Sequence, residues 1–170
     1  MQDSQQGQDP FVYCAELVRT RHYDHFLCTL LAPVAQRRAM FAVYAFAAEV
    51  AHIHNVVSEP MLGEIRLQWW RDAVEEVCGA TEVRAHPVVQ AMHKIQQQVK
   101  MDKVLLLDVI DAHTADIYPD PVENVEAYAK SIGGGVMGLI AQQLRGDVAT
   151  AVHYAPQTAL YFIEPETIAQ

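Results

Sequence analysis

Apolar residues recur at spacings of three and four along most of the chain, which is the period of an amphipathic helix. The pattern is clearest between residues 36 and 51, where the repeating positions are Met40, Phe41, Val43, Tyr44, Ala48 and Ala51. Alanine is dense in the same segment, so neighbouring helices can approach it closely on several sides. We therefore predict that this segment is the central helix of the fold.

Start and stop signals divide most of the remaining chain into further helices. In chain order, the predicted helices cover residues 11–21, 60–77, 87–99 and 104–115. Residues 22–25 are predicted to form a polar corner after the first of these helices. Pro60 fits the first turn of the second helix, and Gly79 is its stop signal.

A last helix is predicted to begin at Asp120, with Pro121 and Glu123 in its first turn, and to end at Gly146. It contains three successive glycines at 133–135, each of which costs about 1 kcal/mol against alanine inside a helix. Such glycines indicate a place where another helix or a ligand must come close. We find no series of strands, so the predicted fold class is all-α.

Length and charge limit what kind of protein this is. With 170 residues, the chain is predicted to hold one helical domain at 11–146, between a disordered tail at 1–10 and a divergent segment at 147–170. The net charge of -9, without a Lys/Arg-rich run, argues against a nucleic-acid partner. The sequence shows neither a signal peptide nor a membrane-spanning run. We expect a cytoplasmic protein, with peripheral contact to the inner membrane left open.

The three cysteines, Cys14, Cys28 and Cys78, are widely spaced along the chain. No pair of them has the spacing of a zinc site. We therefore expect three buried thiols in a reducing compartment.

Polar residues interrupt the predicted central helix near its end. Glu49, His52 and Asn55 follow one another at intervals of three, so successive members share a helix face. Glutamate and histidine on adjacent turns can bind a metal ion or move a proton. The alternative is a polar remnant of the core that local hydrogen bonds satisfy.

The next predicted helix carries an aromatic and basic cluster that consists of Arg66, Trp69, Trp70 and Arg71. Such a cluster can hold an anion or stack on a flat group. Tryptophan at this spacing can equally belong to the core, with the arginines paired to acidic residues of the same helix. If the two helices face each other, they line one groove.

A second acidic set lies in the predicted helix at 104–115 and just beyond it. Asp108 and Asp111 share one helix face, and His113 shares another with Asp116. A hard cation such as Mg²⁺ needs carboxylates that converge on one point. A solvated helix face explains these residues equally well.

Several segments, in a fixed order, resemble the squalene/phytoene synthase family. The run RRAMFAVYAF, from Arg37 to Phe46, is similar to the helix that leads into the family's first Asp-rich motif. The segments SEPMLGEIRLQWWRDAV and HPVVQAM, the run from Asp111 to Asp116 and a tyrosine-containing helix that enters IGGGV follow in the family's order. The resemblance covers residues 12–146. It implies the all-α isoprenoid synthase fold, a helical bundle around a central cavity, here incomplete at its C-terminus.

Active members of that family bind prenyl diphosphates through Mg²⁺ ions that two Asp-rich helices hold. The metal ions neutralise the leaving diphosphate while an allylic cation forms in an apolar cavity. The matching positions of the first motif are Ala51, His52 and Asn55, with Ala48 where an arginine usually precedes the motif. A Ser-Phe pair of the family is replaced around Asp24-His25.

The residue patterns and the resemblance together supply candidate site residues. Tyr44 and Tyr128 are the candidate catalytic residues, and Glu49, Asp111 and Asp116 are the candidate metal ligands. The substrate groove is expected to contain Arg37, Glu49, His52, Asn55, Arg66, Trp69, Trp70 and Gly134. The family's second Asp-rich motif does not occur in residues 147–170, so the last helices of the family are expected to be missing.

The sequence is most similar to the branch of the family that contains the mitochondrial respiratory complex I assembly factor and its bacterial relatives. We therefore expect a pseudoenzyme without a cofactor, whose partner is a complex I subunit or assembly protein. The alternative is an active prenyltransferase that condenses two prenyl diphosphates with Mg²⁺. A bound isoprenoid or prenyl diphosphate is left open, and an open cavity would favour an oligomer.

Overall fold

The computed structural model describes residues 9–118, 124–146 and 148–151. In chain order its helices are α1 (Pro10–Arg21), α2 (Tyr23–Leu31), α3 (Val34–Ala51), α4 (Ile53–Val56), α5 (Pro60–Gly79), α6 (Pro87–Gln96), α7 (Lys103–Ala112), the short 3-10 helix η1 (Ala115–Ile117) and α8 (Val125–Gln143). No strand occurs among the described residues, which confirms the all-α class. None of the helices in this part of the chain is long and apolar enough to cross a bilayer.

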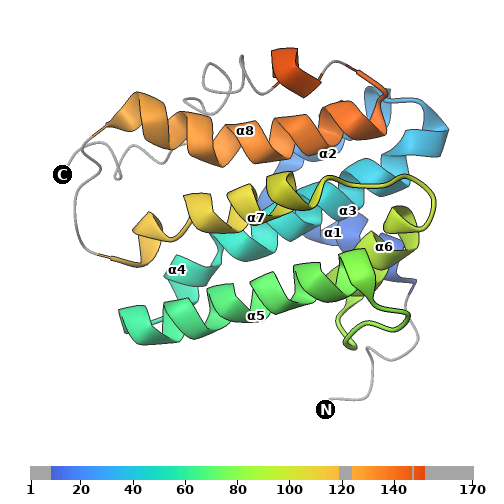
Figure 1. Cartoon of the computed structure of the whole chain (residues 1–170). Coiled ribbons are helices and arrows are strands. Elements are labelled where there is room, and N and C mark those ends of the chain that lie inside the picture. The colour runs from blue at the N-terminus through green and yellow to red at the C-terminus, as the bar shows by residue number, and fades with distance from the viewer. Residues whose placement is uncertain (1–8, 119–123, 147, 152–170) are drawn as a thin grey trace.

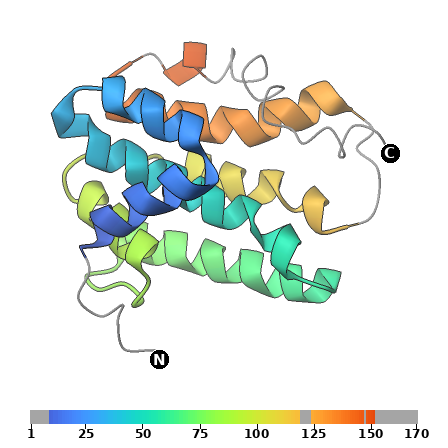
Figure 2. The ribbon, with the colours of Figure 1, turned by 180° about the vertical axis from the view of Figure 1, so that it is seen from behind.

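Helix α3 is the centre of the bundle. Its residues Ala42, Val43, Ala45 and Phe46 are completely buried. Helices α1 and α2 pack against one side of α3 (Figure 2), and α6, α7 and α8 contact it from other directions (Figure 1). The predicted central helix is therefore confirmed, because short alanine side chains let several helices approach the same backbone.

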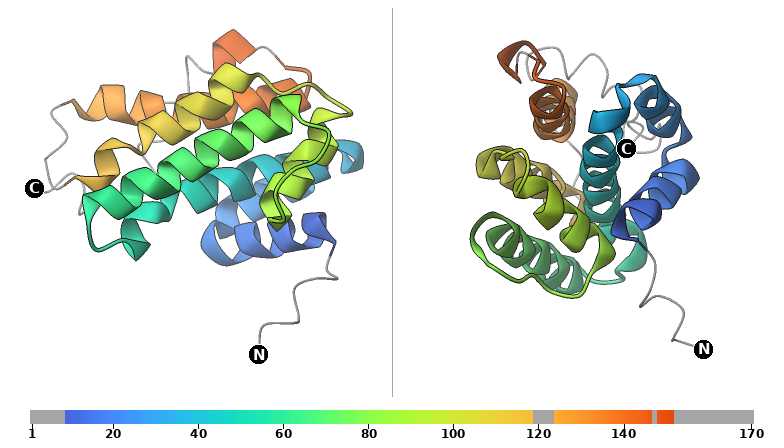
Figure 3. Two further views of the ribbon diagram at one scale, coloured as in Figure 1. Left: turned by 60° about the horizontal axis from the view of Figure 1, so that its bottom comes forward. Right: turned by 90° about the vertical axis from the view of Figure 1, so that its right-hand side faces the viewer.

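Helices α5 and α8 run along opposite edges of the bundle (Figure 1). On its inner side α5 contacts α6 and α7, and it buries Gly63, Leu67, Trp70 and Val74 there. Its other side lies at the surface of the bundle (Figure 3, left). One face of α5 therefore belongs to the core, and the other is available to solvent.

Prolines mark the starts of three helices. Pro10, Pro60 and Pro87 are the first residues of α1, α5 and α6, where the missing N–H has no intrahelical partner to lose. Pro10 was predicted to lie in a disordered tail but is part of α1. The Asp9 side chain caps that helix by accepting a hydrogen bond from the N–H of Phe11 at 3.0 Å.

Several predicted boundaries differ from the structure, and the helix predicted to reach residue 115 ends at Ala112. Residues 22–25 were predicted as a polar corner, but Tyr23 begins α2, which gains packing because Phe26 stacks on Phe41 at 5.5 Å. The helix predicted to reach residue 99 ends at Gln96. The side chain of Gln96 accepts a hydrogen bond from the N–H of Met101 at 2.7 Å and so stabilises the turn that follows.

Only one of the two predicted ends of α8 can be compared with the structure. The predicted start at Asp120 lies outside the described residues, and the described helix begins at Val125 with Asn124 as its cap. At the other end, Arg145 takes a φ of 55° and the N–H of Gly146 donates to the carbonyl of Ala141 at 2.8 Å. The left-handed residue is therefore the arginine and not the glycine that was predicted to end the helix.

The prediction of three buried thiols was wrong. Cys14 is buried, Cys78 is half-buried and Cys28 is exposed, and all three are free. Cys28 belongs to α2, where Leu27, Leu30 and Leu31 are exposed as well. Burial raises the pKa of the Cys14 thiol to about 12, so this thiol stays protonated and behaves as a small apolar side chain.

The glycine run of α8 is a point of close helix contact, as its sequence indicated. A Cβ atom at Gly135 would lie 2.8 Å from Cγ2 of Val109 and 2.9 Å from the carbonyl oxygen of Leu105. Both neighbours belong to α7, and one of them is backbone that cannot rotate away. Helices α7 and α8 therefore touch at a distance that only glycine allows.

We predict that Gly135→Ala lowers the free energy of unfolding by about 1–3 kcal/mol, because the new methyl group must push α7 and α8 apart. Chemical denaturation monitored by circular dichroism measures the effect. Gly79→Ala is the matched control, since a Cβ there meets no atom within 4 Å. An equal effect of the two substitutions would contradict the close contact at Gly135.

Candidate functional site

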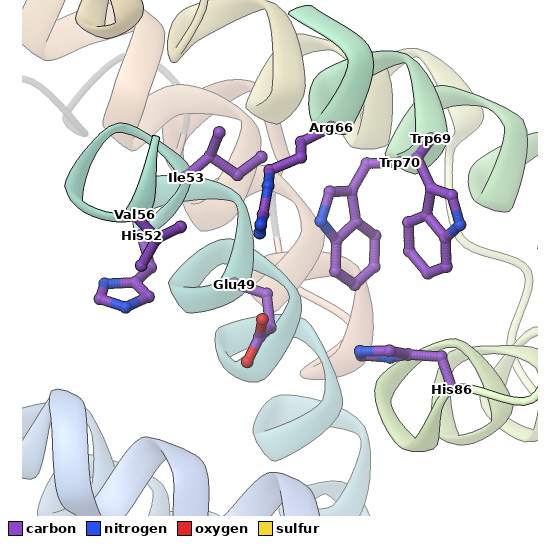
Figure 4. Close-up of a pocket in the computed structure, with 8 residues that line it drawn as sticks. All are labelled: Glu49, His52, Ile53, Val56, Arg66, Trp69, Trp70 and His86. Carbon is purple, nitrogen blue, oxygen red and sulfur yellow. The ribbon is translucent and has the colours of Figure 1, made fainter. Parts of the chain in front are cut away.

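A pocket of about 190 Å³ opens between α3, α4, α5 and the start of α6. Figure 4 shows the side chains that line it, which are Glu49, His52, Ile53, Val56, Arg66, Trp69, Trp70 and His86. Glu49 comes from the last turn of α3, and the two tryptophans come from α5. We call this cavity the α3–α5 pocket.

Aromatic rings form one wall of the α3–α5 pocket. Trp70 lies on the buried face of α5 and packs edge-on against Phe46 at 5.4 Å. His86 packs against Trp70 at 5.3 Å and against Trp69 at 5.5 Å. This wall forms because Trp70 continues the apolar face of α5 while Trp69 lies at the edge of that face.

The outer tryptophan is held by an arginine from the loop after α5. The Arg84 guanidinium lies 4.5 Å from the ring centre of Trp69, a cation–π geometry, and donates to the Trp69 carbonyl at 2.9 Å. It also pairs with the Glu76 carboxylate at 2.7 Å. Hydrogen bonds from Arg84 lower the pKa of Glu76 to about 2. These contacts fix Trp69 while part of its ring stays exposed.

Some charged side chains around the α3–α5 pocket form ion pairs and others do not. The Glu49 carboxylate pairs with Arg21 of α1 at 3.3 Å, and Arg21 also donates to the carbonyl of Ala48 at 3.3 Å. Burial lowers the pKa of His86 and of His52, and the Arg21 charge lowers that of His52 further. Within the described part of the chain, Arg66 has no recorded hydrogen bond or ion pair, although its side chain extends into the pocket (Figure 4).

The structure brings together five of the predicted groove residues, namely Glu49, His52, Arg66, Trp69 and Trp70. The remaining candidates lie elsewhere. Asn55 is exposed on α4, and the Arg37 side chain donates to the carbonyl of Ala32 at 2.9 Å. Gly134 is buried in α8. Arg71, the fourth member of the aromatic and basic cluster, pairs with Asp111 on α7 instead of with an acidic residue of its own helix.

Sequence reasoning missed His86, Ile53 and Val56 as pocket residues. In the sequence, His86 stands out only as the residue before the proline that begins a helix. That position places it at the open end of α6, and the loop after α5 carries it back beside the tryptophans. Its ring nitrogen Nδ1 is buried without a hydrogen-bond partner among the described residues. No pattern local to residue 86 could have indicated this long-range contact.

The size of the α3–α5 pocket limits its occupants. Cavities that enclose drug-sized ligands measure about 300–1,000 Å³. At about 190 Å³, the α3–α5 pocket is smaller than such cavities. It has room for one protein side chain or a small anion.

Tyr44, a candidate catalytic residue, lies outside the α3–α5 pocket. Its ring stacks on His25 of α2 at 4.5 Å with an interplanar angle of 4°. Burial raises the pKa of the Tyr44 hydroxyl to about 12 and lowers the pKa of His25 to about 4. Both side chains are therefore neutral near pH 7.

Tyr128, the other catalytic candidate, belongs to a polar network between α8 and η1. Its hydroxyl donates to one oxygen of the Asp116 carboxylate, and Nδ1 of His113 lies 2.6 Å from the other oxygen. His113 and Asp116 therefore do share a face, as their spacing indicated. Burial and the Asp116 carboxylate raise the pKa of the Tyr128 hydroxyl, so this group remains a hydrogen-bond donor.

The candidate metal ligands do not converge. Glu49 pairs with Arg21, Asp111 pairs with Arg71 at 2.7 Å, and Asp116 lies in the tyrosine–histidine network. Among the described residues, no group of three or more His, Cys, Asp or Glu side chains is arranged to hold a metal ion. The carboxylates that we can place therefore do not fit the Mg²⁺ site that the resemblance implied.

We predict that Tyr128→Phe lowers the free energy of unfolding by about 1–3 kcal/mol, because the half-buried Asp116 carboxylate loses a donor. Tyr118→Phe is the matched control, since its hydroxyl donates to Glu64 at 2.7 Å in an exposed position. Urea denaturation should show a change of no more than about 0.5 kcal/mol for the control. Equal effects would mean that the Tyr128–Asp116 contact adds no stability of its own.

The His25 ring predicts a pH dependence. Its pKa of about 4 in the folded protein lies below the value of 6.5 that it has when unfolded, so the unfolded chain binds the proton more readily. Stability should therefore fall as pH decreases from about 6.5 to 4, by at most about 3 kcal/mol from this partly exposed residue. His25→Phe should keep the stacking on Tyr44 and reduce that fall. Identical pH profiles of the two proteins in thermal denaturation would contradict the expectation.

Comparison with known folds and families is informative over most of the chain. The family model for squalene/phytoene synthase matches residues 18–161. The crystal structure of a dehydrosqualene synthase in complex with ligand has a similar fold, with a TM-score of 0.73 over 88% of this chain and 52% of that one. Its sequence is 18% identical, which supports the fold alone. The chain thus has the all-α isoprenoid synthase fold that its sequence motifs implied.

Curated relatives are more similar in sequence. The "NADH dehydrogenase (ubiquinone) complex I, assembly factor 6" of Rattus norvegicus is 31% identical over 139 residues, 80% of this chain and 41% of the rat protein. The Homo sapiens protein of the same name is 30% identical over 78% of this chain and 40% of its own length. The chain thus spans about two fifths of the length of these relatives. On the family match and these relatives together, the chain belongs to the squalene/phytoene synthase family.

Proposed function

We propose that this protein is a non-catalytic member of the squalene/phytoene synthase family that acts in the assembly of respiratory complex I. The observation that carries the proposal is its 30–31% identity to complex I assembly factors from two mammals. The synthase of similar fold is only 18% identical. The proposed partner is a subunit of complex I or another of its assembly proteins, met at the surface of the inner membrane.

The residues at the end of α3 support a non-catalytic role. Ala51 offers no ligand atom, Asn55 carries no charge, and the nearby Glu49 carboxylate already pairs with Arg21. Ionisation of a prenyl diphosphate requires strong neutralisation of the departing anion, commonly the largest part of the catalysis. In this proposal the helical bundle serves as a binding scaffold and needs no cofactor.

We predict that cells without the gene contain less assembled complex I. Blue native electrophoresis with an in-gel NADH dehydrogenase stain measures the loss, and a wild-type copy of the gene should restore the complex. Respiratory complexes other than complex I serve as the internal control. Normal amounts of complex I in the deletion strain would overturn the assembly role.

The catalytic alternative has its own test. In this proposal, purified protein with Mg²⁺ and farnesyl or geranylgeranyl diphosphate releases no diphosphate above the rate of a heat-denatured sample. Diphosphate release, or a squalene-like or phytoene-like product, would show an active prenyltransferase instead. Mass spectrometry of the native protein, carried out alongside, would reveal any isoprenoid that it retains.

A further inference from the structure

The outer side of α5 is unusually apolar for an exposed helix face. Met61, Leu62, Ile65 and Trp69 lie there at spacings of three and four, and Val56 is exposed on α4, which contacts α5. The side chains of Met61 and Ile65 are 70% and 59% exposed. We call these five residues the α5 stripe. Single exposed apolar residues are common on proteins, but a contiguous group marks a surface that binds something.

The α5 stripe continues into the α3–α5 pocket, because Val56 and Trp69 belong to both. Arg66 follows Leu62 by one helical turn and extends from this border into the pocket (Figure 4). The other charged residues of α5 have contacts, which are Glu64 with Tyr118, Arg71 with Asp111, Asp72 with Gln68, Glu75 with Lys103 and Glu76 with Arg84. In the described part of the chain, Arg66 has no such contact, so its guanidinium is available.

We propose that the α5 stripe and the α3–α5 pocket together dock an amphipathic helix of a partner protein, and that a carboxylate of this helix binds Arg66. The inference rests on the proposed function and specifies the chemistry of its partner. A helix can place apolar side chains along the stripe at the same spacing of three and four. One aspartate or glutamate side chain fits the pocket and meets a guanidinium that can bind it through two hydrogen bonds.

Local charges favour an acidic partner side chain over a basic one. The Glu49 carboxylate already pairs with Arg21, so the positive charge of Arg66 is the unbalanced charge of the pocket. The indole ring of Trp69 is also unavailable to a second cation on the face that Arg84 covers. A carboxylate therefore finds an ion-pair partner here, whereas an ammonium group would meet Arg66 as a like charge.

The same surroundings disfavour a lipid bilayer as the occupant. The chain carries a net charge of -9. Near the stripe, Glu59 is the N-cap residue of α5 and Glu64 lies within the helix. Anionic lipid surfaces attract segments rich in Lys and Arg. An apolar stripe next to carboxylates suits a protein helix better than an anionic membrane.

A displayed library of helical peptides, selected on the intact purified chain, tests the docking site. Selected peptides should combine apolar residues at spacings of three and four with an aspartate or glutamate. Arg66→Glu should weaken their binding by about tenfold or more, as expected for a charge at the centre of an interface. Lys94→Glu makes the same change of charge at an exposed position on α6 and should alter binding by no more than about twofold.

A charge exchange separates a direct contact from a structural effect. Peptides in which lysine replaces the acidic residue should bind the Arg66→Glu variant better than they bind the wild type. Ile65→Ser should weaken both kinds of peptide, because it removes part of the stripe and leaves Arg66 in place. Circular dichroism of each variant confirms that it is folded.

Three results would overturn the docking site. These are selected peptides without an acidic residue, equal binding to the wild type and to Arg66→Glu, and the absence of any enriched peptide. A fourth result would also overturn the proposal. If the wild type binds vesicles of phosphatidylcholine and phosphatidylserine and Ile65→Ser abolishes this binding, the stripe contacts a membrane instead.

Complementation separates this proposal from the proposed function. If the wild type restores complex I in the deletion strain and Arg66→Glu restores it equally well, the assembly role stands and the docking site is wrong. If Arg66→Glu fails where Lys94→Glu succeeds, both are supported. If the deletion strain has normal complex I, the assembly role falls, and the peptide selection alone decides the docking site.

Discussion

The burial of α3 on several sides is the constraint on which the rest of the structure depends. Its middle turns contain only apolar residues, and Ala42, Val43, Ala45 and Phe46 are fully enclosed. A charge placed there would lose its hydration without a partner. Charged residues of α3 lie only toward its two ends, with Arg37 and Arg38 near the start and Glu49, which meets Arg21 of α1, in the last turn. The pocket forms at that end because α3 emerges there from the surrounding helices.

The three acidic residues that the sequence offered as candidate metal ligands make internal contacts. Glu49 joins α3 to α1, Asp111 joins α7 to α5 through Arg71, and Asp116 joins η1 to α8 through Tyr128. Each pair links two different helices. The described carboxylates thus hold the bundle together, which is consistent with a scaffold whose function lies in its surface.

Much of the fold could be predicted because periodicity and helix caps are local signals. The central helix follows from its alanine-rich pattern, and Pro60 and Pro87 mark real helix starts. Only part of the site could be predicted from the sequence. Glu49, His52 and the tryptophans lie on neighbouring helices and do meet. His86 joins them through tertiary packing, and Arg71 leaves them for Asp111 on another helix. Neither contact has a signature in the sequence nearby.

The contact at Gly135 has a consequence for motion within the bundle. The close approach of α8 to α7 at Gly135 leaves little room for sliding, and the Tyr128–Asp116 bond attaches the start of α8 to η1, which follows α7 directly. Helices α7 and α8 should therefore shift as one rigid lever. Arg71 and Lys103 connect that lever to α5. These contacts form a continuous chain of packed elements from α8 through α7 to the helix that bears the pocket tryptophans.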